Sequence, residues 1–185
     1  MVSVASLWLP VLLSAVLVFI VSSVIHMVLT YHKSDMGPLP DEAGVADALR
    51  PLDIPPGDYV IPYAADSNAM GSDEYMEKTK SGPVAFLTVL PNEPLGIGRS
   101  LALWFGYSVV VGGLAGYVAG MALGPGAEYG AVFRIVSTVA FAGYSLAILQ
   151  NSIWWHRSWS YTLKTMFDGL IYALLTGGAF GWLWP

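Results

Sequence analysis

The chain has 185 residues, of which 55% are hydrophobic and 11% are charged, and its mean hydropathy is +0.59. Soluble domains carry about a quarter charged residues, so this composition indicates an integral membrane protein. The net charge is −5, and no cluster of Lys and Arg argues for a nucleic-acid partner. The chain lacks cysteine, which excludes disulfides, iron–sulfur clusters and thiolate zinc sites.

Four apolar stretches are long enough to cross a bilayer, which takes about 20 helical residues. They cover residues 4–30, 101–123, 131–149 and 162–184. We therefore expect an all-α integral membrane fold, a bundle of four transmembrane helices. The first stretch, within residues 1–30, has no Lys or Arg before it and is longer than the apolar core of a signal peptide. We interpret it as a retained anchor.

Residues 31–100 separate the first helix from the other three, which lie in residues 101–185. This segment is too long for a bare turn. Its sequence predicts a short helix at 41–49, strands in "DYVIPYAA" and "PVAFLTVLP", and a helix over "SDEYMEKTK" with Ser72 as its N-cap. We expect a small α+β insertion whose scattered acidic residues form a solvated face. No nucleotide-binding or hydrolase motif appears in it.

The second apolar stretch carries a glycine at every fourth position. The four are Gly112, Gly116, Gly120 and Gly124. This spacing is typical of a glycine zipper, in which the missing side chains let another helix approach closely. The pattern leaves open whether that helix belongs to the same chain or to a second copy.

Polar residues recur every four positions on the first and fourth stretches and should face the interior of the bundle. The first stripe contains His26, and the fourth contains Lys164, Asp168, Tyr172 and Thr176. We expect a cluster of His26, Lys164, Asp168 and Tyr172, in which Lys164 neutralises Asp168. Two roles stay open: a structural link between helices, or a path for protons or cations.

We predict no metal and no cofactor from the three histidines of the chain. His26 and His32 are six residues apart, which would put them on different faces of one helix. His156 lies in the turn between the third and fourth stretches, so its pairing with His26 on a haem would need both at one depth in the membrane.

The distribution of Lys and Arg predicts the orientation. Lys33, Arg99, Arg157 and Lys164 flank helix ends on the side of the 31–100 loop, whereas the other side has only Arg134. We therefore expect loop 31–100 in the cytoplasm and both termini outside.

Several phrases resemble a group of small four-span bacterial membrane proteins with no known activity. They are "PPGDYVIPYAAD", "SGPVAFLTVLPN", "NSIWWHRSW" and "TLKTMFDGLIYALLTGGAFGWLWP". The resemblance implies a four-span protein of the bacterial inner (plasma) membrane. It implies no activity and assigns no site residues.

The leading hypothesis is a non-catalytic membrane protein, a structural or accessory subunit of a larger membrane assembly or a homo-oligomer. Its partners would be the lipid bilayer and other membrane subunits or further copies of itself. The alternative is a small channel, transporter or proton-conducting component that uses His26, Lys164 and Asp168. A membrane enzyme or cofactor carrier is the third hypothesis.

Overall fold

The computed structural model describes residues 1–94 and 96–185. The chain divides into two compact units. Met1–Gly37 and Gly96–Pro185 form the first, which we call the helical unit, and Pro38–Leu95 forms the second, which we call the insertion. The insertion Pro38–Leu95 lies within the sequence segment 31–100 that separates the first apolar stretch from the others.

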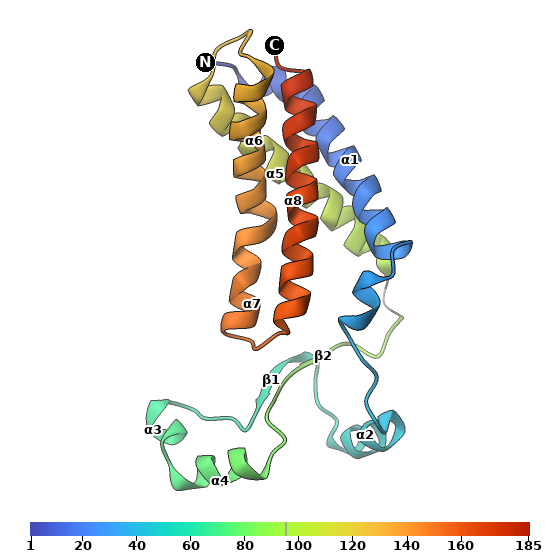
Figure 1. Ribbon diagram of the computed structural model, residues 1–185. Coiled ribbons are helices and arrows are strands. Elements are labelled where there is room, and N and C mark those ends of the chain that lie inside the picture. The colour runs from blue at the N-terminus through green and yellow to red at the C-terminus, as the bar shows by residue number, and fades with distance from the viewer. Residues whose placement is uncertain (95) are drawn as a thin grey trace. The chain divides into compact units, whose positions relative to one another are not determined.

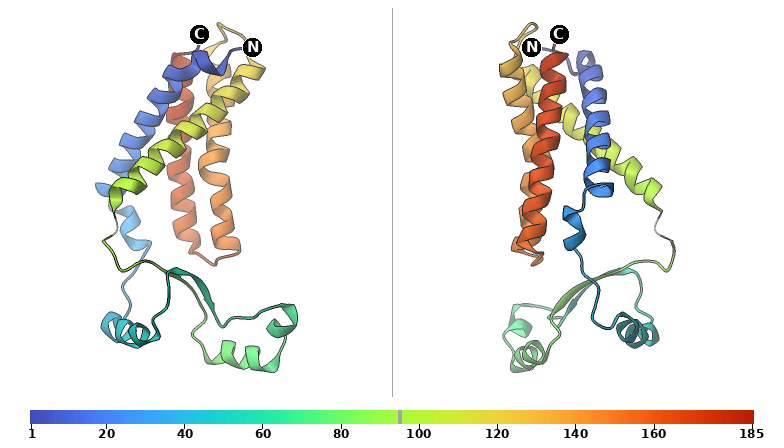
Figure 2. Two further views of the ribbon diagram at one scale, coloured as in Figure 1. Left: turned by 180° about the vertical axis from the view of Figure 1, so that it is seen from behind. Right: turned by 45° about the vertical axis from the view of Figure 1, so that its right-hand side comes forward.

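The helical unit consists of long helices that lie side by side in Figures 1 and 2. They are α1 (Trp8–Met27), α5 (Ile97–Ala122), α6 (Tyr129–Ser145) and α8 (Trp159–Trp182). Shorter elements are η1 (Val4–Leu7), η2 (Tyr31–Ser34), η4 (Leu146–Ile148) and α7 (Leu149–Ile153). Helix α6 packs on α8, α8 on α1, α1 on α5, and α5 on α6.

Three segments of the described chain are helical, long and apolar enough to cross a membrane. They are Val4–Met27, Ile97–Ala122 and Tyr129–Ile153. Helix α8 forms where the fourth span was predicted, but it is not among the three. Its length suffices, and its average hydropathy is lowered by Asp168 together with glycine, threonine and aromatic residues.

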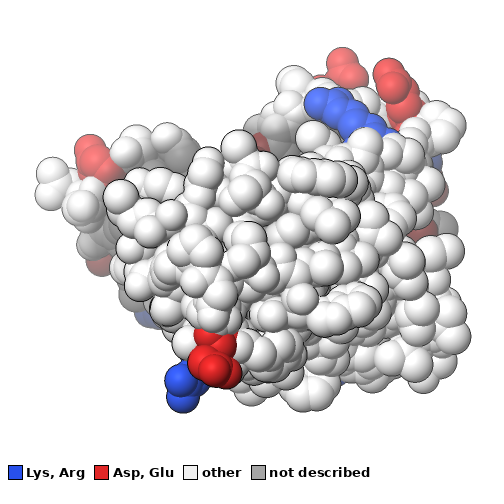
Figure 3. All heavy atoms as spheres, turned by 90° about the horizontal axis from the view of Figure 1, so that it is seen from above, with Lys and Arg blue, Asp and Glu red and all other residues white. Residues whose placement is uncertain are grey.

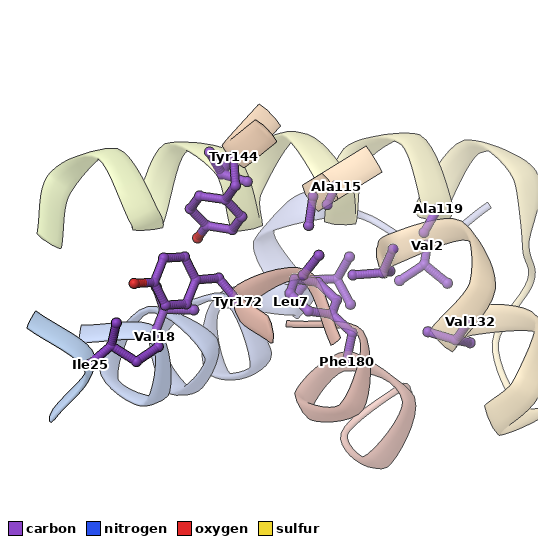
Figure 4. Close-up of a cluster of buried hydrophobic side chains, with 14 residues drawn as sticks. Val2, Leu7, Val18, Ile25, Ala115, Ala119, Val132, Tyr144, Tyr172 and Phe180 are labelled. Carbon is purple, nitrogen blue, oxygen red and sulfur yellow. The ribbon is translucent and has the colours of Figure 1, made fainter. Parts of the chain in front are cut away.

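The core of the helical unit is built from small and branched side chains together with a few larger ones, among them Tyr144 and Tyr172. Leu7 and Phe180 are fully buried and lie close together in Figure 4, where α1 begins and α8 approaches its end. Other members are Val18, Ala115, Ala119, Val132, Val136, Ala140 and Ala173. Figure 3 views the structure from the end at which both termini lie, where almost all visible residues of the helical unit are uncharged.

Three of the four regularly spaced glycines, Gly112, Gly116 and Gly120, lie against other parts of the same chain. A Cβ on Gly112 would lie 3.1 Å from Oγ of Ser14, and one on Gly116 would lie 2.7 Å from Phe180. At Gly120 it would meet the carbonyl oxygen of Val2 at 2.6 Å. Gly124 has open space around it because α5 ends at Ala122.

The insertion contains a two-stranded antiparallel sheet and short helices. Its elements are α2 (Glu42–Leu49), η3 (Arg50–Leu52), β1 (Gly57–Ile61), α3 (Ser67–Met70), α4 (Asp73–Ser81) and β2 (Ala85–Val89). Tyr59 of β1 pairs with Leu87 of β2. The predicted cap of α4 is present, because Oγ of Ser72 accepts a hydrogen bond from the amide of Tyr75. Among residues 38–94, only Pro62 is buried.

The contact between α6 and α8 can be tested at two adjacent glycines. A Cβ on Gly177 would lie 2.9 Å from Cβ of Ser137 and 3.0 Å from the carbonyl oxygen of Phe133, whereas one on Gly178 would meet nothing closer than 3.8 Å. We expect Gly177→Ala to destabilise the protein by about 1–3 kcal/mol through overpacking. The matched control Gly178→Ala should cause no loss, because alanine favours a helix over glycine. Thermal unfolding in detergent measures both, and equal effects would contradict this packing.

Candidate functional site

The candidate site forms where α1 ends. The first predicted span runs to residue 30, but the helix ends at Met27 and the chain turns into η2. The sequence changes at this point from apolar residues to "TYHKSD", whose short polar side chains compete for backbone hydrogen bonds and favour turns. The turn η2 is closed by hydrogen bonds from the amide of Lys33 to Thr30 and from that of Asp35 to His32.

Asp168 of α8 is the buried centre of the site, with 1% of its surface exposed. The hydroxyl of Tyr31 donates a hydrogen bond to its Oδ1. Nε2 of His32 lies 2.8 Å from its Oδ2. Each carboxylate oxygen therefore has its own partner from η2. A carboxylate in an apolar setting needs such partners, because burial without them is costly.

His32 stands between two carboxylates. Its Nδ1 lies 2.5 Å from Oδ2 of Asp35, while its Nε2 faces Asp168. Both ring nitrogens can donate hydrogen bonds only when the ring carries a proton on each, as in the imidazolium form. In the neutral ring one nitrogen is an acceptor that faces a carboxylate oxygen. At 2.8 Å the pair of Nε2 and Oδ2 has the distance of a hydrogen bond.

Lys164 connects α8 to the same turn. Its Nζ donates to the carbonyl oxygen of Tyr31 at 2.6 Å, to Oγ of Ser34 at 2.8 Å and to Oδ1 of Asp35 at 2.7 Å. The Asp35 side chain is 8% exposed and that of Lys164 is 23% exposed. The predicted neutralisation of Asp168 by Lys164 is therefore wrong. The two stand one helical turn apart, but η2 brings Asp35 to the lysine.

The electrostatic effect of this arrangement is visible at Asp35. Desolvation by itself would raise the pKa of this carboxyl. The hydrogen bonds from Lys164 and His32, with the charges of both, outweigh it and hold the pKa below its ordinary value. Asp35 is thus ionised at neutral pH and forms a charged link between η2 and α8.

His26 completes the group at the last turn of α1. Its ring centroid lies 4.6 Å from that of His32. One ligand atom each from His26, His32 and Asp168 lie within 4.8 Å of one another. The predicted separation of His26 from His32 is wrong, because α1 ends at Met27, between the two histidines. His26 is exposed, whereas Asp168 is buried.

Tyr172 lies one helical turn further along α8 and belongs to the interior rather than to this group. Its ring contacts Tyr144 at 5.7 Å and Trp104 at 5.7 Å between centroids. Figure 4 shows the rings of Tyr144 and Tyr172 beside each other, with both hydroxyls turned away from Leu7 and Phe180. The Tyr172 hydroxyl is buried and has no hydrogen-bond partner among the described residues.

We call His26, Tyr31, His32, Asp35, Lys164 and Asp168 the polar cluster. The polar stripes predicted His26, Lys164 and Asp168 as members, but not the contacts that Tyr31, His32 and Asp35 of the turn make with them. The signal for them was the abrupt polar run after the first span. The arrangement can link α1 to α8, hold a cation or relay a proton.

Comparisons with protein-family models, with curated proteins and with solved structures found no match to the chain.

The link between Lys164 and Asp35 predicts a stability effect. Lys164→Met leaves the Asp35 carboxylate with His32 alone and the Tyr31 carbonyl without this donor. We expect the free energy of unfolding to fall by about 1–3 kcal/mol, the usual cost of removing a charged hydrogen-bond partner. Chemical unfolding in detergent measures this.

The matched control is the exposed ion pair between Lys78 and Glu74, whose side chains are 60% and 78% exposed. Lys78→Met should change the free energy of unfolding by less than about 0.5 kcal/mol. If Lys164→Met lowers the free energy of unfolding as little as Lys78→Met does, the cluster does not hold α8 to η2.

Proposed function

We propose that the chain is a non-catalytic integral membrane protein that serves as a structural or accessory subunit of a larger membrane assembly or of a homo-oligomer. The observation that carries the proposal is the insertion, which is folded but has almost no interior of its own. A two-stranded sheet with short helices is marginal by itself. It gains stability when its apolar side chains are covered.

Several large apolar side chains of the insertion are exposed. Leu52 is 64% exposed, Tyr63 is 74% exposed and Val84 is 61% exposed. The insertion also has ten acidic and three basic residues, a net charge of −7. An anionic lipid surface attracts basic segments and repels a segment of this charge. A protein surface therefore fits the insertion better than the bilayer does.

The polar cluster supports a structural role for the helical unit. Asp168 accepts a hydrogen bond from Tyr31 and faces His32, and Lys164 is paired with Asp35. The charges of the cluster are thus satisfied by one another within the chain. Such a network fixes the end of α1 on α8 and specifies one arrangement of the helices.

We further propose α8 as a fourth span of a four-helix bundle in the bacterial inner membrane, with loop 31–100 cytoplasmic and both termini outside. Helix α8 runs alongside α6 in Figure 1, and the two termini lie at the same end. The distribution of Lys and Arg supports this orientation. The resemblance to small four-span bacterial membrane proteins also implies four spans and an inner-membrane location. A reporter fused after Pro185 tests the orientation and should report the outer side.

Native mass spectrometry of the protein, extracted from its own host in mild detergent, tests the accessory role. We expect a stoichiometric complex with another membrane protein or with further copies. Val84→Asp should reduce the recovered complex, because it puts a charge on the apolar surface of the insertion. Asn92→Asp is the control, since it adds the same single negative charge at an exposed position without removing apolar surface. A monomer, or a complex that tolerates Val84→Asp, would contradict the proposal.

Conduction of protons or cations is the second candidate. The buried Tyr172 hydroxyl favours it, because this unpaired polar group lies one turn beyond Asp168 toward the centre of α8. Proteoliposomes containing the purified protein separate the two functions. The accessory role predicts no proton flux above that of empty liposomes. A flux that is present in the wild type and lost in Asp168→Asn would establish conduction instead.

A further inference from the structure

We propose that His26, His32 and Asp168 form a binding site for one divalent transition-metal ion of the Zn²⁺ class. The site lies where α1 ends against α8, and its three ligands come from α1, η2 and α8. The inference goes beyond an accessory role and does not depend on it, because it concerns the helical unit alone.

The distances suit such an ion after small adjustments. One ligand atom from each of the three residues lies within 4.8 Å of the others. Around a tetrahedral Zn²⁺ with bonds of 2.0–2.2 Å to nitrogen and oxygen, the ligand atoms are about 3.3–3.5 Å apart. Nε2 of His32 and Oδ2 of Asp168 are already 2.8 Å apart. An ion would therefore separate these two atoms slightly and draw the exposed His26 ring toward them.

The side chains that hydrogen-bond to the proposed ligands are arranged as they are around bound metal ions. Oδ2 of Asp35 faces Nδ1 of His32 at 2.5 Å, so a neutral ring that donates there turns the lone pair of Nε2 toward Asp168. Lys164 holds the other oxygen of Asp35. A carboxylate on the far nitrogen of a ligating histidine fixes its tautomer and orientation. The Tyr31 hydroxyl likewise occupies Oδ1 of Asp168 and leaves Oδ2 for the ion.

The charges favour a cation as well. The Asp168 carboxylate is itself one of the three ligands, and the carboxylate of Asp35 lies directly behind His32. A bound ion would also engage the ring of His26. The side chain of His26 makes a ring contact with His32 and has no hydrogen bond to another described residue. Its ring contact is therefore with a second proposed ligand, His32.

The ligand set selects the class of metal. Imidazole and carboxylate ligands together suit Zn²⁺, Co²⁺, Ni²⁺ and Fe²⁺, whereas Mg²⁺ and Ca²⁺ prefer oxygen ligands alone. Three protein ligands leave at least one coordination position open on a tetrahedral ion.

The test is metal titration of the full chain, purified in detergent without a polyhistidine tag and stripped of metal by a chelator. Calorimetry follows Zn²⁺, and visible absorbance follows Co²⁺. We expect one ion per chain, with Mg²⁺ binding far more weakly. His26→Gln should weaken Zn²⁺ binding at least tenfold while leaving the melting temperature of the metal-free protein unchanged. Asp35→Asn should weaken it by about 10–100-fold, as expected for a group that orients a ligand.

His156→Asn is the matched control, because it removes a histidine outside the cluster. His156 has a positive φ of 51°, a conformation that asparagine tolerates. Zn²⁺ affinity should be unchanged in this variant. The proposal is overturned if the wild type binds no Zn²⁺, or if His26→Gln binds it as tightly as the wild type does. It is also overturned if His156→Asn causes the larger loss. Because His26 lies outside the link between Lys164 and Asp35, the result does not depend on whether the cluster variants fold.

Discussion

The burial of one carboxylate, that of Asp168, determines how the helical unit is organised at the end of α1. An aspartate near the centre of a membrane helix costs on the order of 3 kcal/mol on insertion scales, and less near the interface. Helix α8 alone offers no partner for it, since the nearest lysine pairs elsewhere. The partners come from η2, so the turn after α1 has to lie against α8.

This requirement explains why α1 stops early. A helix continued to residue 30 would carry Tyr31 and His32 further along the α1 axis. Ending at Met27 lets the chain fold back, and the two hydrogen-bond partners reach the carboxylate. Lys164 then secures the turn from the other side through Ser34 and Asp35. The apolar packing of α1 on α5 and α8 supplies the affinity between helices, and the polar contacts fix their position.

The sequence was sufficient for features that depend on neighbouring residues. Apolar runs predicted the long helices, and the Ser72 cap of α4 followed from a local motif. Glycine spacing indicated a close approach on α5, but Gly124 lies past the end of that helix and has open space around it. Features that depend on distant residues were predicted less well. The partners of Asp168 are 136 and 137 positions away, and no periodicity encodes such a contact.

The short distance along the chain between the polar cluster and the insertion has a further consequence. Asp35 lies two residues before Gly37, where the helical unit gives way to the insertion. A partner that orders or pulls on the insertion acts on the segment that positions His32 and Asp35. Coupling between two binding events is reciprocal. If one ligand changes the affinity for a second ligand by some factor, the second changes the affinity for the first by the same factor. If a partner binds the insertion, as proposed, the covalent connection to η2 joins its binding site to the segment that positions His32 and Asp35.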